Sequence, residues 1–157
     1  MPKIYISGGP GSGKTTYAKK ISQELGIPHF DLDDIKWINQ INYVNKERPK
    51  EERLSLRDKI LTENDNWVIE GIYTKDWIIP MLEQADKIII MKPSTLTRQY
   101  RIIKRSLRRM LNIEPKKHKE GFSSLFKLLI WSRQYDKYLP EFMEKVKRLN
   151  KTVEFIR

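Results

Sequence analysis

The sequence predicts a three-layer α/β domain, in which a parallel sheet has helices on both faces. Segments with strand character alternate with segments of helical periodicity along the chain, and this alternation is typical of a parallel sheet with crossover helices. The run Lys87–Met91 is almost continuously apolar, as expected for a strand buried on both faces. The chain has 157 residues, of which 39% are apolar, so we expect a sizeable core and one domain over residues 1–157.

The first half of the chain supplies three of the expected strands. Residues rich in strand formers are found at 3–7, 29–30 and 67–71. After the first strand, apolar residues recur at helical spacing up to Leu25, and Gly26 and Pro28 end this helix. Further helices are expected at 50–63 and about 77–84. Residues 31–34 open a turn or another helix, whereas residues 39–49 are polar and are expected to be irregular.

The second half begins with the buried strand at 87–91, which Pro93 stops. A long helix is expected over about 94–111. Residues 112–121 contain Asn, Pro, Gly and three lysines, and this composition favours a mobile segment. The helical pattern then resumes at 122–138 and again at 140–149, and the last strand is expected at 152–156.

The charge is concentrated in the C-terminal part of the chain. The formal net charge is +11; residues 93–157 contain 17 Lys and Arg against 6 Asp and Glu, whereas the preceding part is balanced with 14 of each sign. A basic surface of this kind favours an anionic partner, which can be nucleic acid, a membrane surface or the phosphates of a small substrate.

The residues Gly8-Gly9-Pro10-Gly11-Ser12-Gly13-Lys14-Thr15 match the phosphate-loop pattern G-x-x-x-x-G-K-[ST] in full. Glycines allow consecutive backbone N–H groups to surround a phosphate, and the helix that follows presents its N-terminus to the same group. We expect Lys14 to reach the β- and γ-phosphates of ATP and the Thr15 hydroxyl to bind Mg²⁺. The expected nucleotide-binding set consists of Gly8, Gly9, Pro10, Gly11, Ser12, Gly13, Lys14, Thr15 and Thr16.

Several other classes of protein are disfavoured. The chain has no cysteine, which excludes disulfides and thiolate metal sites. The GTPase motifs D-x-x-G and N-K-x-D do not occur, since Asn150-Lys151 is followed by Thr152-Val153. His29 and His118 lack partners at the spacing of a metal site. No apolar run approaches the roughly 20 residues needed to span a bilayer, and the N-terminus lacks the apolar core of a signal peptide. A cytoplasmic protein without membrane contact is therefore expected.

Three sequence features together with the phosphate loop resemble a known family. The first feature is the motif Leu32-Asp33-x-x-x-Trp37, and the second is Trp67-Val68-Ile69-Glu70-Gly71-x-Tyr73. The third is an arginine-rich helix after the fourth strand. The combination is similar to the adenylate-kinase-related topology modulation proteins, also called FlaR, over most of the chain. The resemblance implies a nucleoside-monophosphate-kinase-like fold, a five-stranded parallel sheet of order 2-3-1-4-5, and a lid segment that closes over ATP, which we expect at about 112–121.

The acidic residues Asp31, Asp33 and Asp34 follow the second strand, at the sheet edge where open α/β sheets bind ligands. Asp33 is the candidate for orienting an acceptor hydroxyl, as an aspartate does in the similar shikimate and gluconate kinases, whereas Asp31 is expected to cap a helix. Glu70 ends the third strand, and we expect it to support Mg²⁺ together with Thr15. Adenylate kinases carry Gly-x-Pro-Arg after this strand, but here Gly71 leads into Ile72-Tyr73-Thr74, which disfavours a nucleoside monophosphate as acceptor. The glycine triplet of shikimate kinases is missing as well.

The long helix at 94–111 is amphipathic at 100° per residue. Its arginines fall within one arc of about 100°, and these are Arg98, Arg101, Arg105, Arg108 and Arg109. Its apolar residues, apart from Ile102, occupy the opposite arc, which we expect to pack on the sheet. The guanidinium face would then neutralise the triphosphate, with Arg105 and Arg109 as catalytic candidates and Arg133 as a weaker one.

The leading hypothesis is an ATP-dependent kinase that uses Mg²⁺ and a small-molecule phosphate acceptor. Two alternatives remain open: a nucleic-acid-binding module whose footprint is the basic half, for which no DNA-reading motif is found, and a nucleotide-binding regulator with little turnover. Trp37, near the aspartates, is a candidate for flanking a ring-shaped acceptor. The sequence does not identify the acceptor.

Overall fold

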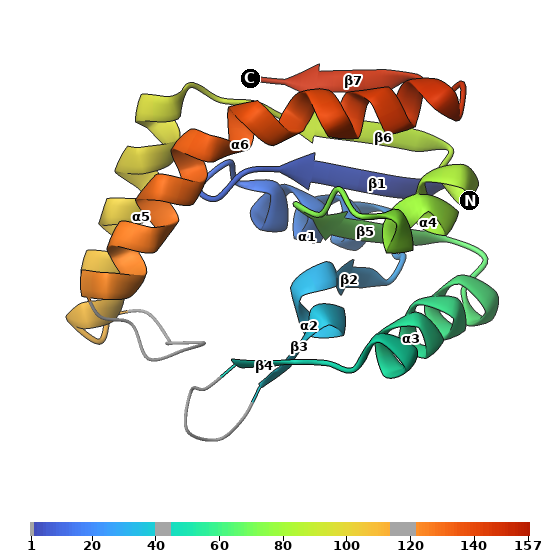
Figure 1. Cartoon of the computed structure of the whole chain (residues 1–157), viewed down its shortest axis with the longest axis horizontal. Coiled ribbons are helices and arrows are strands. Elements are labelled where there is room, and N and C mark those ends of the chain that lie inside the picture. Colours follow the sequence, from blue (N-terminus) through green and yellow to red (C-terminus); the bar gives the residue numbers. More distant parts are fainter. Residues whose placement is uncertain (1, 40–44, 114–121) are drawn as a thin grey trace.

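A five-stranded sheet forms the centre of the protein in the computed structural model, which describes residues 2–39, 45–113 and 122–157 (Figure 1). Every pair of neighbouring strands in this sheet is parallel. The strands lie side by side in the order β2 (His29–Asp31), β5 (Trp67–Gly71), β1 (Lys3–Gly8), β6 (Lys87–Met91) and β7 (Val153–Ile156). Counted along the chain, these five strands have the order 2-3-1-4-5, so the predicted sheet is confirmed.

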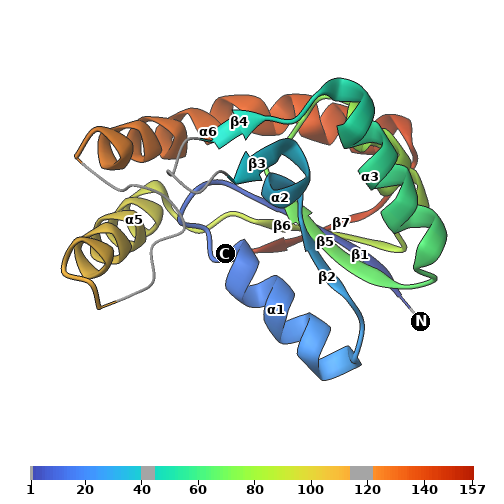
Figure 2. The ribbon, with the colours of Figure 1, turned by 90° about the horizontal axis from the view of Figure 1, so that it is seen from below.

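Helices cover both faces of this sheet, as Figure 2 shows from below. The helix α1 (Lys14–Leu25) packs on one face. The other face is covered by α2 (Leu32–Lys36), α3 (Lys50–Glu63), the 3₁₀ turn η1 (Asp76–Ile78), α4 (Ile79–Gln84) and α6 (Phe122–Arg148). The helix α5 (Thr95–Met110) lies at the margin, beside α6. The predicted three-layer arrangement is therefore confirmed.

The central strands divide their side chains between two cores. Tyr5 of β1 packs with the residues under α4 and α6, whereas its neighbours Ile4 and Ile6 pack with the residues under α1. Strands β5 and β6 alternate in the same way, and four residues in a row from Ile88 to Met91 are buried. This two-sided burial explains why these strands are continuously apolar in sequence.

Two predicted elements differ from the structure. The polar stretch at 39–49 was expected to be irregular, but β3 (Trp37–Asn39) and β4 (Asn45–Glu47) form a small antiparallel pair on either side of residues 40–44. The backbone ladder stabilises this pair without an apolar pattern. The two helical stretches near the C-terminus are one helix, since α6 continues through Pro140. Proline removes one hydrogen bond within the helix, while the buried side chains of Leu139 and Phe142 on either side keep the helix packed on the core.

The orientation predicted for α5 is wrong. Its buried residues are Arg98, Ile102 and Ser106, and its apolar stripe points to solvent. The exposed fractions lie between 40% and 78% for Leu96, Tyr100, Ile103, Leu107 and Leu111. Because α1 and α6 already cover the sheet next to the phosphate loop, α5 has no sheet surface to pack on. It packs instead against α6 and the loop through its polar face.

The expected lid at 112–121 falls mostly on residues 114–121, which lie outside the described residues, as does His118. Within the described ranges, none of the helices is long and apolar enough to cross a membrane.

Candidate active site

The phosphate loop connects the end of β1 to the start of α1. Gly11 and Gly13 have φ angles of 76° and 92°, a conformation that glycine adopts without strain. Gly13 is the N-cap residue of α1, and the Ser12 N–H donates to the Gly9 carbonyl over 3.1 Å. The predicted nucleotide-binding residues from Gly8 to Thr16 therefore lie in this loop and in the first turn of α1, where Thr16 is exposed.

The loop is tightly enclosed by α5 and α6. A Cβ atom on Gly9 would lie 2.8 Å from the ring of Tyr135 on α6. A Cβ atom on Gly11 would lie 2.4 Å from the backbone oxygen of Arg98 on α5. These contacts leave no room for side chains at either position, so the glycines of the motif serve packing as well as backbone conformation.

We expect Gly11→Ala to weaken ATP binding by at least tenfold and to lower the free energy of unfolding, because the new methyl group would push α5 away from the loop. Gly26→Ala is the matched control, since Gly26 also has a positive φ, 64°, but a Cβ atom there meets nothing within 4 Å. The control isolates the backbone strain, which is on the order of 1 kcal/mol. Nucleotide titration and urea unfolding of both variants measure the difference; equal losses would show that the contact with Arg98 is unimportant.

A buried carboxylate lies beside the loop lysine. Glu70 at the end of β5 is fully buried, and its Oε2 atom lies 3.5 Å from Lys14 Nζ. Its Oε1 atom lies 3.6 Å from Nε2 of His29, the first residue of β2. Burial raises the pKa of Glu70, but the neighbouring His29, Lys14 and Thr15 side chains together lower it below its ordinary value, so the carboxylate is ionised at neutral pH. The sequence predicted Glu70 next to the loop but missed His29.

The three aspartates after β2 have different surroundings. Asp31 is the N-cap of α2, since its Oδ1 atom accepts from the Asp33 N–H over 2.9 Å, which confirms the expected cap. Burial, followed by the negative charges of Glu70 and Asp33, raises the pKa of Asp31 to about 6. Asp33 Oδ1 accepts a hydrogen bond of 2.5 Å from the Tyr73 hydroxyl. The Asp34 side chain is exposed.

Aromatic and cationic side chains form a layer next to Asp33. Lys36 Nζ lies 4.7 Å from the ring centre of Trp37 and 4.8 Å from that of Tyr73. The rings of Tyr73 and Trp77 are 5.3 Å apart, and the Arg53 guanidinium lies 5.4 Å from the Trp77 ring. Trp37 thus lies near the aspartates, as predicted. The contact of Tyr73 with Asp33 was not predicted, although Tyr73 belongs to the sequence motif that begins in β5 and ends just after it.

The arginines of α5 do not act as one uniform face. Arg101 Nη1 donates to the Ser12 carbonyl over 3.0 Å, so this side chain joins α5 to the phosphate loop. Arg105 and Arg109, the predicted catalytic arginines, are half-buried further along the same inward side of the helix. Arg133 on α6 is exposed. Arg98, Arg105 and Arg109 are thus turned inward, the reverse of the expected exposure, whereas the Arg101 and Arg108 side chains are exposed.

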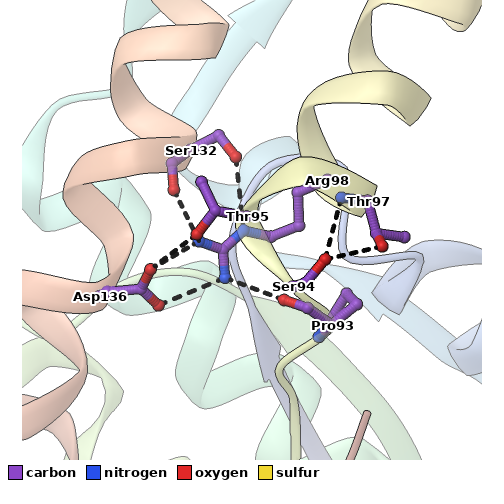
Figure 3. Close-up of polar contacts among 7 residues, drawn as sticks. All are labelled: Pro93, Ser94, Thr95, Thr97, Arg98, Ser132 and Asp136. Carbon is purple, nitrogen blue, oxygen red and sulfur yellow. Dashed lines mark hydrogen bonds and ion pairs between the residues drawn. The ribbon is translucent and has the colours of Figure 1, made fainter.

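Arg98 joins α5 to α6 and does not face the phosphate loop with its guanidinium (Figure 3). The side chain is 1% exposed. Its Nη2 atom donates to Asp136 Oδ2 over 2.8 Å and to the Ser132 carbonyl over 2.9 Å. Further hydrogen bonds reach the Pro93 carbonyl, Thr95 Oγ1 and Ser132 Oγ. The arginine's donors are thus held by the protein itself, so the expectation that Arg98 belongs to a phosphate-neutralising face is wrong.

The residues present fit a nucleotide phosphate with Mg²⁺. The glycine loop offers a cradle without side chains next to Lys14, and both Glu70 oxygens are buried without a hydrogen-bond partner of ordinary length. No cluster of three or more His, Asp or Glu side chains able to hold a metal is found among the described residues. Thr15 and Glu70 are the residues that fit Mg²⁺, since this ion binds proteins through one or two side chains and takes its remaining ligands from substrate phosphates and water.

Comparisons with known proteins agree with this geometry. Residues 7–117 match the family described as AAA domain. A cytidylate kinase from Desulfurococcus amylolyticus is 28% identical over 109 residues, and the match covers 61% of this chain and 57% of that protein. The chain thus spans little more than half the length of that relative. The solved structure of shikimate kinase from Acinetobacter baumannii in complex with shikimate has a TM-score of 0.60 at 20% identity, covering 100% of this chain and 83% of that one.

The shikimate kinase structure shows that the fold is shared, and the cytidylate kinase shows that proteins of similar sequence include a kinase. The family match begins inside β1, takes in the phosphate loop and the aspartates, and extends beyond α5. Because the matched region is well over half of the chain, the protein belongs to the AAA domain family and has the fold of the P-loop kinases.

Proposed function

We propose that the protein is an ATP-dependent kinase that transfers the γ-phosphoryl group of ATP to a small-molecule acceptor. The observation that carries this proposal is the position of three groups at one edge of the sheet. Lys14 follows β1, Glu70 ends β5 and Asp33 follows β2, and these strands are neighbours in the sheet. A parallel sheet brings its carboxyl ends to the same edge, so a donor on the loop and an acceptor at Asp33 would meet there.

The proposed roles follow from charge and position. The loop amides and Lys14 would bind the β- and γ-phosphates, and Thr15 with Glu70 would hold Mg²⁺, whose positive charge offsets that of the phosphates. Arg101 fixes α5 against the loop, and Arg105 and Arg109 on the same side of this helix would neutralise charge on the transferring group. In the transfer, the acceptor oxygen bonds to the γ-phosphorus while the bond to the bridging oxygen breaks. ADP leaves with that electron pair, and the acceptor proton goes to Asp33.

The resemblance to the topology modulation proteins agrees with a P-loop kinase fold and leaves the acceptor undefined. Binding to nucleic acid has no support among the described residues beyond the basic charge, and two of the α5 arginines, Arg98 and Arg101, donate to α6 and to the loop. We therefore treat nucleic-acid binding as a property to be tested in parallel with kinase activity.

The test measures ADP release from Mg-ATP in the presence of nucleoside monophosphates, nucleosides, shikimate and sugar acids. A kinase is expected to release ADP faster with at least one acceptor than with water alone, and Asp33→Asn should remove that gain. Duplex DNA is titrated in parallel at two salt concentrations, because clustered Lys and Arg bind DNA non-specifically at low salt. ATP-dependent DNA binding that persists near physiological salt, without any acceptor-stimulated release, would contradict the proposal.

A further inference from the structure

The acceptor side of the site carries an accumulation of negative charge. Asp31 and Glu70 are paired neighbours near the ends of β2 and β5. Asp33 is the second residue of α2, and its N–H donates to the Asp31 carboxylate. The strand pairing and this hydrogen bond thus place the three carboxylates next to one another at the same edge of the sheet. Among the described residues, Lys14 is the lysine that pairs with Glu70, and it is also the lysine that the donor phosphates require.

The cations nearest the acceptor side are already engaged. Lys36 lies between the rings of Trp37 and Tyr73. Arg53 Nη1 donates to Glu47 over 2.8 Å. The neighbouring arginines on this side are bound as well: Arg57 contacts Asp58 and the Trp77 carbonyl, and Arg48 contacts Glu52 and the backbone of Asp34 and Ile35. Bidentate recognition of a phosphate uses an arginine guanidinium, and the guanidinium groups of Arg48, Arg53 and Arg57 are directed at other groups of the protein.

From this arrangement we infer that the acceptor presents a neutral hydroxyl group, and that a nucleoside monophosphate is excluded from the acceptor position by charge. The inference rests on the proposed kinase function and names its substrate class. A phosphate nucleophile needs no base and would be repelled by Asp31 and Asp33, whose charges the Mg²⁺ proposed at Glu70 does not directly offset. A hydroxyl nucleophile carries no charge, and its proton needs an acceptor such as a carboxylate. This separates the chain from its cytidylate kinase relative, whose name states a nucleotide substrate.

Tyr73 acts in this scheme as a positioning residue. Its hydroxyl donates to Asp33 Oδ1, which leaves Oδ2 for the acceptor hydroxyl. Burial, followed by the charge and hydrogen bond of Asp33, raises the pKa of Tyr73, so the phenol stays protonated and keeps donating. The ring is further held by Trp77 and Lys36. Tyr73 therefore fixes the direction of the Asp33 carboxylate without contacting the transferring group.

The experiment compares matched acceptors on the wild-type protein. Cytidine and CMP, and adenosine and AMP, differ in the group at the 5′ position; shikimate and gluconate extend the hydroxyl class. ATP binding is measured first, since its absence would contradict the proposed function and not the substrate class. CMP and AMP are then titrated onto the protein saturated with a non-hydrolysable ATP analogue. We expect no saturable binding below about 1 mM and no stimulation of ADP release; either result with a monophosphate would overturn the inference.

Water serves as the hydroxyl acceptor in every assay, so the outcome does not depend on including the natural substrate. Basal ADP release should fall at least tenfold in Asp33→Asn, with little change in the KM for ATP, whereas Asp34→Asn on the same helix should retain it. Basal release that is equal in wild type and Asp33→Asn would overturn the role of this carboxylate.

The variant Asp31→Asn/Asp33→Asn tests exclusion by charge. It keeps a good cap residue on α2 and should bind CMP at least tenfold more tightly than wild type. Unchanged binding of CMP would overturn exclusion by charge.

A double-mutant cycle tests Tyr73. Tyr73→Phe keeps the ring and removes the hydroxyl, and we expect it to lower basal ADP release about threefold to tenfold. The same change made on Asp33→Asn should have no further effect, because residues that act through one another are not additive. Equal losses in both backgrounds would mean that Tyr73 acts only through the stability of the aromatic layer.

Discussion

Lys14→Ala is expected to lower acceptor-stimulated ADP release by about two to three orders of magnitude, because one charged contact to the transferring group contributes that much to the rate. The fold should survive, since Lys14 is partly exposed and its ionic partner Glu70 also contacts His29. Steady-state kinetics with the best acceptor measures the effect, and circular dichroism checks the fold.

Lys20→Ala is the control for this prediction. Lys20 lies on the same helix, is 68% exposed and makes an exposed ion pair with Glu24, a type of pair that contributes little to stability. Its removal should leave kinetics and stability nearly unchanged. If Lys14→Ala retained turnover close to that of Lys20→Ala, the proposed transfer on the phosphate loop would be wrong.

Arg98→Met is expected to lower the free energy of unfolding by about 2 kcal/mol, because removing the buried arginine leaves the partly exposed Asp136 carboxylate and two carbonyl groups without their donor. Asp136 would lose its cation, and the carbonyls of Pro93 and Ser132 would lose a donor. Urea unfolding measures the change. The Arg98 side chain holds α5 on α6, and the Arg98 backbone lies against Gly11. A shift of α5 in the variant should therefore lower ATP affinity as well.

Arg148→Met is the control for Arg98→Met, since Arg148 is 75% exposed and pairs with Glu144 within one helix.

The ion pair between Arg98 and Asp136 also predicts that stability depends on pH. The hydrogen bond from Arg98 is the main cause that lowers the pKa of Asp136, so this stabilisation is present above the ordinary aspartate pKa of about 3.9 and is lost as pH falls through the lowered value. The difference in stability between wild type and Arg98→Met should therefore shrink in acid; a pH-independent difference would contradict an ionic origin.

The parts of the structure that the sequence predicts well are those specified locally. The phosphate-loop motif fixes its own backbone through Gly11 and Gly13, and the apolar runs of β1, β5 and β6 indicate strands buried on both faces. The place of Glu70 followed from its position at the end of β5. In each case the residues that determine the feature are adjacent in the chain.

Features that depend on distant partners were not predicted. The apolar stripe of α5 would normally face a core, and its reversal depends on Asp136 and Ser132, which lie on another helix. The hydrogen bond between Tyr73 and Asp33 joins residues 40 positions apart, and neither residue by itself indicates the other. The short strands β3 and β4 have no apolar alternation, so their backbone pairing left no pattern in the sequence.

The central position of β1 has a consequence for the order in which the protein can be built. This strand is synthesised before the other strands of the sheet, yet its two neighbours β5 and β6 are made much later, since Tyr5 pairs with Ile69 and Ile88. During synthesis the apolar side chains of β1 have no sheet partner until about the middle of the chain has emerged. Pairings between distant segments close slowly, and transiently exposed strand edges favour aggregation. A chain truncated before β6 would therefore lack one neighbour of its central strand and would present that apolar edge to other molecules.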